Sequence, residues 1–148
     1  MTAPATAEAI ARIASRNRGG DYAPDWELAI TGYDELRGYA GSLMPVSDAI
    51  PSVDDYWVHI AGVFNGTKLT AYANGKKVLE APIAAVKDSD NKLAFGAKDR
   101  TMVRGHFTGL FDEFRLRDAV STADWVKAEY DQSEATFLIS DGAKAASR

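Results

Sequence analysis

Two Asn-Gly pairs, Asn65-Gly66 and Asn74-Gly75, interrupt a stretch of alternating apolar residues near the middle of the chain. Apolar runs over 57–64 and 69–73 flank the first pair, and a shorter run over 77–81 follows the second. Asn and Gly tolerate the positive φ values of two-residue primed turns, so Asn-Gly between alternating runs is a strong hairpin signal. The pattern therefore predicts antiparallel strands and commits the chain to β architecture.

Further short segments have strand character. Residues 25–31 alternate apolar and polar positions, which predicts a half-buried strand with a hairpin partner over 36–40. Residues 10–15 fit either a strand or a helical turn, because Ile10 and Ile13 have helical spacing while the following pattern favours a strand. We predict other strands over 92–97, 107–117 and 137–140, and loops over 42–55 and 84–91.

One helix is predicted over 121–132. Ser121 followed by Asp124 is close to a capping box, and we expect Trp125 and Ala128 to dock the helix. Many short strands with one short helix predict an all-β, antiparallel sandwich. We expect a flexible arm over 1–9, one domain over 10–141 and a tail over 142–148.

Composition excludes several classes of function. The net charge is −4, and the basic residues are interspersed with acidic ones, which argues against a nucleic-acid partner. No apolar run approaches the ~20 residues that a membrane-spanning helix needs, so we expect no membrane insertion. The chain has no cysteine, which excludes disulfides and thiolate metal sites. Its first residues lack the pattern of a signal peptide.

Five segments in order carry a family resemblance: WVHIA at 57–61, LTAYANGK at 69–76, LAFG at 93–96, FTGLFDEFRL at 107–116 and STADWVKAEY at 121–130. Together they resemble the laminin-G-like, concanavalin A-like lectin/glucanase domain of bacterial surface proteins. The resemblance implies a jelly-roll β-sandwich with a C-terminal helix, in which Trp57 and Tyr72 are scaffold. Little sequence precedes Ile13, which leaves open a truncated domain, an edge completed by another chain, or a minimal fold.

Asp112 and Glu113 are the candidate catalytic pair, because glucanases of this superfamily use two carboxylates. Adjacent strand residues point to opposite faces, whereas a retaining pair lies ~5–5.5 Å apart around one bond. We therefore expect Asp112 to be buried, with backbone N–H partners, and we assign no catalytic residue. A lone His59 is predicted to be an interior or hairpin contact.

The resemblance also implies calcium as a candidate cofactor, since some laminin-G-like domains bind it through loop carboxylates. The oxygen-bearing candidates are Asp88, Asp90, Asn91 and Asp99, with Asp54 and Asp55 as a second group. Calcium takes about six or more oxygens, and a short acidic loop is otherwise simply solvated, so both interpretations stay open.

Aromatic residues in or near loops are the candidate ligand-binding residues. Tyr22, Tyr33 and Tyr39 are predicted to stack on a sugar, as is Tyr56. The alternative is that such tyrosines pack at the rim with their hydroxyl groups in water.

The leading hypothesis is a non-catalytic recognition or adhesion module that binds carbohydrate or a protein surface through its loops. The alternative is a structural or assembly protein of a virion or surface layer that forms a homo-oligomer through an open sheet edge. A glycosidase is the weaker alternative. We expect an extracellular or cell-envelope location if the chain belongs to a longer exported protein, and a virion or cytoplasmic location otherwise.

Overall fold

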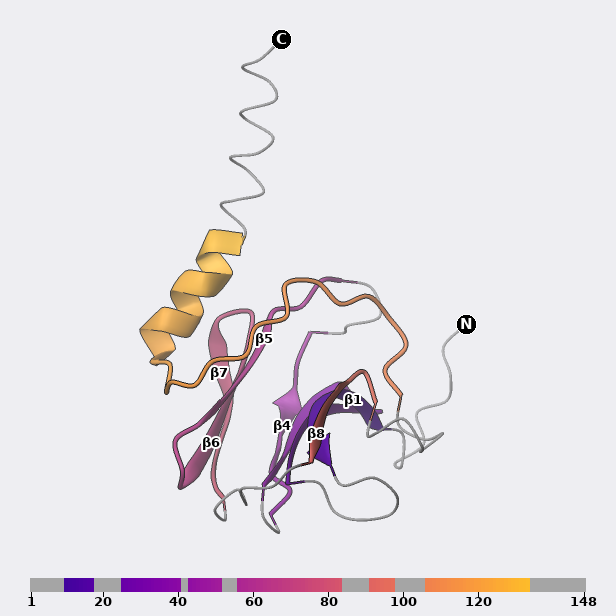
Figure 1. The fold of residues 1–148 in the computed structure, drawn as a ribbon. Coiled ribbons are helices and arrows are strands. Elements are labelled where there is room, and N and C mark those ends of the chain that lie inside the picture. Colours follow the sequence, from indigo (N-terminus) through magenta and orange to yellow (C-terminus); the bar gives the residue numbers. More distant parts are fainter. Residues whose placement is uncertain are drawn as a thin grey trace.

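The structure, a computed structural model, describes residues 10–17, 25–40, 43–51, 56–83, 91–97 and 106–133. Within these residues, strands β1 to β8 form two antiparallel sheets, and one helix covers residues 123–133. The two sheets face each other in Figure 1, with β5, β6 and β7 on the left and the other strands on the right. The predicted all-β antiparallel sandwich with one short helix is confirmed.

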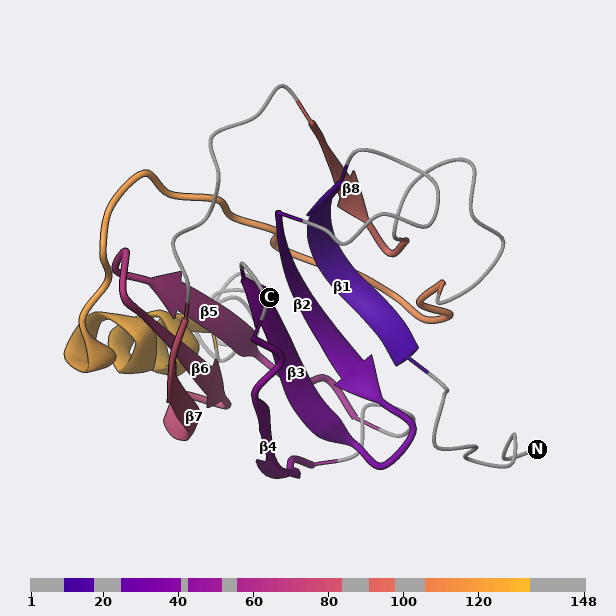
Figure 2. The ribbon, with the colours of Figure 1, turned by 90° about the horizontal axis from the view of Figure 1, so that it is seen from below.

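The large sheet has the strand order β4-β3-β2-β1-β8. Figure 2 shows β1 to β4 side by side from below. Leu28 and Ile30 on β2 are buried on its inner face, and the predicted hairpin of β2 with β3 is confirmed by the pairing of Ile30 with Leu36. Its strands are β1 (Ile10–Asn17), β2 (Trp26–Thr31), β3 (Glu35–Ala40), β4 (Val46–Ala49) and β8 (Lys92–Phe95).

The small sheet confirms the hairpin that the Asn-Gly pairs predict. Its order is β5-β6-β7, with β5 at Ile60–Phe64, β6 at Lys68–Ala73 and β7 at Lys76–Pro82. The side-chain oxygen of Asn65 accepts hydrogen bonds from the backbone N–H groups of Thr67 (3.1 Å) and Lys68 (2.8 Å). In the second turn Asn74 and Gly75 have φ values of 49° and 72°, which is the left-handed region where this pair is favoured.

Two segments in the N-terminal half are strands where the sequence left the structure open or predicted a loop. Residues 10–17 form strand β1, so the strand alternative holds over the helical turn. Strand β4 lies within 42–55, where we predicted a loop, and the prediction is wrong there. Pro45 and Pro51 bracket a short strand at the sheet edge, where proline is tolerated, and Ser47 accepts a 3.0 Å hydrogen bond from the backbone of Leu36.

The strand predicted over 107–117 is wrong. Residues 106–122, here called the connecting segment, contain no strand, and residues 108–120 are exposed. Glu113 has a φ of 53°, a left-handed value that a non-glycine residue in a strand does not adopt. Its alternating apolar residues therefore do not enter a hydrogen-bonded ladder within the described part of the chain.

The helix over 123–133 begins slightly later than predicted, and its docking residues differ. The hydroxyl of Thr122, rather than Ser121, accepts a hydrogen bond from the N–H of Trp125 (3.2 Å), which is an N-cap. Val126 is 1% exposed, whereas Trp125 is 48% exposed and Ala128 is also exposed. The prediction that Trp125 and Ala128 dock the helix is wrong, because the buried stripe runs through Val126 instead.

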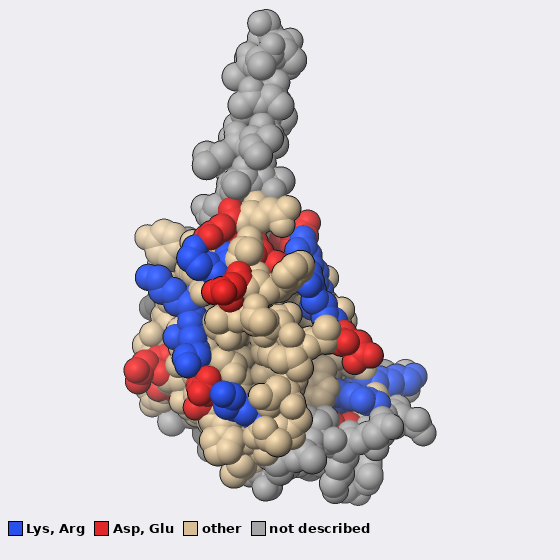
Figure 3. Space-filling view, turned by 90° about the vertical axis from the view of Figure 1, so that its left-hand side faces the viewer, with Lys and Arg blue, Asp and Glu red and all other residues tan. Residues whose placement is uncertain are grey.

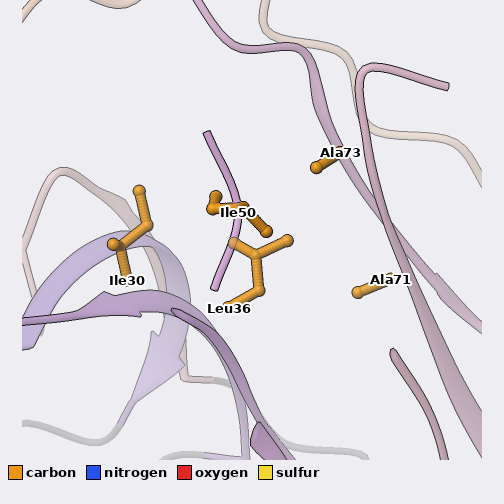
Figure 4. Close-up of a cluster of buried hydrophobic side chains, with 5 residues drawn as sticks. All are labelled: Ile30, Leu36, Ile50, Ala71 and Ala73. Atoms are coloured by element: carbon orange, nitrogen blue, oxygen red, sulfur yellow. The ribbon is translucent and has the colours of Figure 1, made fainter. Parts of the chain in front are cut away.

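The core lies between β2, β3 and the residue after β4 on one side and β6 on the other. Figure 4 shows Ile30 and Leu36 from the large sheet and Ile50 just after β4, with Ala71 and Ala73 from β6 across from them. Small residues let the sheets approach closely, since a Cβ added to Gly38 would lie 1.9 Å from Cδ2 of Leu69. No helix in the described residues is long and apolar enough to cross a membrane.

Candidate binding cleft

A wide cleft of about 1530 Å³ opens between the two sheets. One wall is the inner face of β1 and β2, including Ile13 and Leu28, and the opposite wall is residues 56–64. The connecting segment and the inner side of the helix complete the lining. In Figure 1 the connecting segment, in orange, runs from the side of β1 and β8 to the helix beside the small sheet. The cleft is therefore lined partly by β-strands and partly by a segment that is not part of either sheet.

The two most exposed aromatic residues of the cleft lining are consecutive in the sequence. Tyr56 is 73% exposed and Trp57 is 66% exposed, and both line the cleft just before β5. We predicted Trp57 to be scaffold, and its exposure makes that prediction wrong, whereas Tyr72 is 5% exposed and fits a scaffold role. Aromatic side chains with one polar end are the groups that stack on sugars and protein surfaces.

Ring contacts between four phenylalanines hold the start of the connecting segment, and one of these contacts joins it to β8. The rings of Phe95 and Phe114 lie 4.0 Å apart, and those of Phe107 and Phe111 lie 4.5 Å apart, measured between centroids. Gly96, with φ 65°, allows the approach, because a Cβ there would lie 3.3 Å from the Phe111 ring. These contacts fix one end of the cleft lining, together with a 2.8 Å backbone hydrogen bond from the N–H of Phe107 to the carbonyl of Gly96.

An ionic network holds the other end of the connecting segment to the helix. Glu129 accepts hydrogen bonds from Arg115 (3.3 Å) and Arg117 (2.6 Å), and Arg115 also donates to Glu113 (2.6 Å). Hydrogen bonds to Glu113 and Glu129 raise the pKa of Arg115 above its usual value. The guanidinium of Arg117 lies 4.7 Å above the Trp125 ring. The helix thus positions this side of the cleft through charge pairs.

His59 lies where the helix meets the cleft. Its ring is 5.9 Å from that of Tyr130, and its Nδ1 atom is buried with no hydrogen-bond partner in the structure. Burial lowers the pKa of His59, and the positive charge of Arg115 acts in the same direction, while Glu129 opposes it. The prediction of an interior or hairpin contact fits this position, since the backbone N–H of His59 also donates to Asn74.

The carboxylates at this cleft are engaged within the chain. Asp112, predicted to be buried, is exposed, and that prediction is wrong because its segment is not a strand. The Oδ1 atom of Asp112 accepts a hydrogen bond from the N–H of Glu113 (2.9 Å), and Glu113 in turn pairs with Arg115.

Comparison with known proteins places these observations in a family. A laminin-G-like family model, described as the concanavalin A-like lectin/glucanases superfamily, matches residues 2–142. The chain belongs to this superfamily. The resemblance stated from the five sequence segments is therefore confirmed. A comparison with curated proteins gives no match.

A solved structure is similar to this concanavalin A-like domain. It is an S-layer domain-containing protein (residues 221–444) from Clostridium thermocellum, with 18% sequence identity and a TM-score of 0.41. The match covers 82% of this chain and 63% of that chain. The domain thus spans less than two thirds of that structure.

The predicted tyrosine site is not assembled at the cleft. Tyr33 is exposed in the turn between β2 and β3, and Tyr39 is half-buried on β3, and neither lines the cleft. Tyr22 lies outside the described residues. A sugar-stacking role for these three residues stays a prediction, while Tyr56 and Trp57 are the most exposed aromatic residues of the cleft lining.

The calcium prediction falls mostly outside the described residues. Asp88, Asp90 and Asp99 lie there, as do Asp54 and Asp55. Asn91 is described, and its side-chain amide donates a 2.8 Å hydrogen bond to Asp25. No group of three metal-ligating residues occurs in the described part of the chain. Calcium binding stays a prediction.

The surface shown in Figure 3 mixes charges of both signs. Basic side chains lie in two groups with acidic neighbours, separated by a band of uncharged residues. Glu80, for example, pairs with Lys68 and Lys77, each at 3.2 Å. Among the described residues on this face, the basic side chains do not form a continuous stripe of the kind that binds nucleic acid.

Proposed function

We propose that this domain is a non-catalytic recognition module that binds a carbohydrate chain in the cleft. The observation that carries the proposal is the exposure of two consecutive residues of the cleft lining, Tyr56 and Trp57, which are 73% and 66% exposed. Large aromatic side chains left in water beside a concave surface mark interaction sites. The C–H face of a sugar ring packs on the face of an aromatic ring. The hydroxyl groups of the sugar and the polar end of Tyr or Trp remain available for hydrogen bonds.

Polar groups elsewhere in the cleft lining supply hydrogen bonds for sugar hydroxyl groups. Thr108 and Gln132 are exposed in the lining and carry a hydroxyl and an amide. The connecting segment that carries Thr108 is held at both ends by the phenylalanine contacts and the ionic network. Because these contacts already fix the segment, binding a ligand there costs less conformational entropy.

The engaged carboxylates support a non-catalytic role. Glycosidases use two carboxyl groups, one as acid and one as nucleophile or base. Here Glu113 and Glu129 are both paired with Arg115, and Asp112 accepts a backbone hydrogen bond. A carboxylate whose oxygens already accept hydrogen bonds within the chain has fewer oxygens left to contact a glycosidic bond. A module of this kind acts at a cell surface or in the extracellular space.

The test is a binding screen against neutral hexasaccharides: cellohexaose, xylohexaose and N-acetylated chitohexaose. We expect one of them to bind the intact chain by calorimetry, and we expect the recovered sugar to keep its full length after prolonged incubation. Absence of binding to all three would overturn the carbohydrate proposal. Shortened sugar would instead establish a glycosidase.

A second candidate function, self-assembly, is favoured by one specific observation. Strand β8 is the last strand of the large sheet, and its residues Leu93 and Phe95 are 36% and 48% exposed. An apolar edge strand is a template for pairing with another chain, here a second copy. Sedimentation tests this function: Leu93→Lys, which puts a charge on the edge, should abolish any concentration-dependent oligomer, and a chain that stays monomeric at all concentrations would exclude it.

A further inference from the structure

Glu27 is a buried carboxylate on the side of the large sheet that faces away from the cleft. It is 1% exposed, on strand β2 between Trp26 and Leu28. Leu28 points toward the small sheet, since a Cβ on Gly62 would meet its methyl group at 3.3 Å. Strand side chains alternate in direction, so Glu27 and Ala29 lie on the opposite, outer face.

Two arginines flank Glu27 on that outer face. Arg12 on β1 and Arg37 on β3 are both in register with Ala29, one on each side of β2. Arg12 Nε donates to Glu27 Oε2 at 2.6 Å, and Arg37 Nη2 donates to Glu27 Oε1. Ala29 is fully buried, and its small side chain leaves room between the two longer ones. One carboxylate therefore balances two guanidinium groups, and the cluster keeps one uncompensated positive charge.

The hydrogen bonding of this cluster is incomplete. Each guanidinium has five N–H donors, and the Nε of Arg37 is buried with no hydrogen-bond partner in the structure. Leaving a buried donor of a charged group unpaired is unfavourable. The side chains of Arg12 and Arg37 are 14% and 16% exposed, so an edge of each reaches the surface. The cluster has a net positive charge, and the guanidinium edges at the surface, not the buried Nε of Arg37, are the donors that an anion reaches.

We propose that Arg12 and Arg37 bind the carboxylate of a uronic-acid residue in an acidic polysaccharide. The planar guanidinium fork matches a carboxylate with two parallel hydrogen bonds. A single negative charge balances the one positive charge that Glu27 leaves. Tyr39 is in register with Glu27 and half-buried on the same face, which places an aromatic ring beside the site for the sugar ring.

Tri-galacturonate and its methyl ester test this site, because esterification removes the charge and leaves the sugar unchanged. We expect calorimetry to show binding of the acid and at least about tenfold weaker binding of the ester, since ~1.4 kcal/mol lost from charge-assisted hydrogen bonds corresponds to tenfold. Equal binding of the acid and the ester would overturn the proposal. So would the absence of binding to both tri-galacturonate and a glucuronate trisaccharide.

Variants then locate the site. Arg37→Lys keeps the charge beside Glu27 but removes the fork, and we expect at least about tenfold weaker binding of the acid with the fold intact by circular dichroism. Lys77→Gln is the control, because it removes an exposed cation on the small sheet and should leave binding unchanged. If Arg37→Lys unfolds, the affinity of Arg12→Gln for tri-galacturonate is measured instead, and it should also be weaker than that of the wild type. Equal weakening by Lys77→Gln would mean a general charge effect and would contradict the site.

This site and the cleft are separable. The Arg12 and Arg37 cluster lies on the outer face of the large sheet, whereas Trp57 lies in the cleft lining. Trp57→Ala should leave tri-galacturonate binding unchanged. If no neutral sugar binds in the cleft, the uronic-acid site at Arg12 and Arg37 can still be present. If tri-galacturonate does not bind, the cleft can still bind a neutral sugar.

Discussion

Asn74 binds the backbone of His59 through two hydrogen bonds. Its side-chain oxygen accepts from the N–H of His59 (2.9 Å), and its own backbone N–H donates to the carbonyl of His59 (2.8 Å). The amide of Asn74 thus takes the donor that would otherwise continue the β5 ladder toward Trp57. Strand β5 begins at the next residue, Ile60, and Trp57, two residues before His59, is exposed in the cleft lining.

Replacing Asn74 with alanine tests this link. Asn74→Ala removes the acceptor for His59 and places alanine at a φ of 49°, which is unfavourable for a residue with a Cβ and no local hydrogen bond. We expect the free energy of unfolding to fall by about 1–3 kcal/mol in urea denaturation. Asn65→Ala is the control, because Asn65 is exposed and serves only its own turn. An equal loss in both variants would contradict the link.

Gly38 is a second position where the fold makes a sharp prediction. Gly38→Ala would place a Cβ 1.9 Å from the Cδ2 atom of Leu69, in the contact between β3 and β6. We expect overpacking to lower the free energy of unfolding by about 1–3 kcal/mol. Gly62→Ala meets Leu28 at 3.3 Å and should cost less. Thermal unfolding that ranks Gly62→Ala as the more harmful change would argue against the described packing of the sheets.

Val126 carries the docking of the helix. Val126→Ala deletes two buried methyl groups, and at ~0.8 kcal/mol for each buried carbon plus a cavity term we expect a loss of about 1–3 kcal/mol. Trp125→Ala removes an exposed ring and its contact with Arg117, so it should cost at most about 1 kcal/mol. Denaturation curves in which Trp125→Ala is the more damaging variant would show that the helix docks through the other face.

His59 predicts a specific pH dependence. Burial holds the pKa of folded His59 below its ordinary value of 6.5, so the unfolded chain takes up this proton at higher pH than the folded chain. Stability from His59 is therefore present above about pH 6.5 and is lost as the pH falls toward the folded pKa. The nearby charges are Glu129, which favours protonation, and Arg115, which opposes it.

A variant without the imidazole isolates this contribution. His59→Phe keeps a ring against Tyr130 and removes the titrating group. We expect the wild-type protein to lose more free energy of unfolding than His59→Phe between about pH 7 and pH 5. Parallel stability profiles for the two proteins would mean that His59 has the same pKa folded and unfolded.

The hairpin and the overall sandwich could be predicted because their signals are local. Asn65-Gly66 and the alternation over 69–73 determine turn geometry and side-chain direction within a few residues. Strand β4 could not be predicted, because its strand structure depends on pairing with β3 rather than on a local pattern. The hydrogen bond between Ser47 and Leu36, 11 residues apart, is part of that pairing. The connecting segment has the same alternation as a strand, and the left-handed Glu113 that interrupts it has no signature in the sequence.

The candidate sites divide in the same way. Tyr56 stands next to a loop that the sequence shows, so its exposure could be expected. The exposure of Trp57 has no local signal, because Trp57 belongs to an alternating run but lies before the start of β5, where His59 contacts Asn74, 15 residues after His59. The cluster of Arg12 and Arg37 on Glu27 was missed, although alternation on 25–31 and 36–40 places Glu27 and Arg37 on polar faces. Only the register of β1, β2 and β3 brings the three together.

The central claim is that the cleft binds a neutral sugar chain without cleaving it, through Trp57. It is tested most directly by calorimetric titration of the hexasaccharide found in the screen into wild type, Trp57→Ala and Trp125→Ala. Trp125 is the matched control, an exposed tryptophan that does not line the cleft. We predict that wild type and Trp125→Ala bind alike and that Trp57→Ala binds about tenfold more weakly, as expected for ~1.4 kcal/mol of lost stacking. Unchanged affinity in Trp57→Ala would contradict the account.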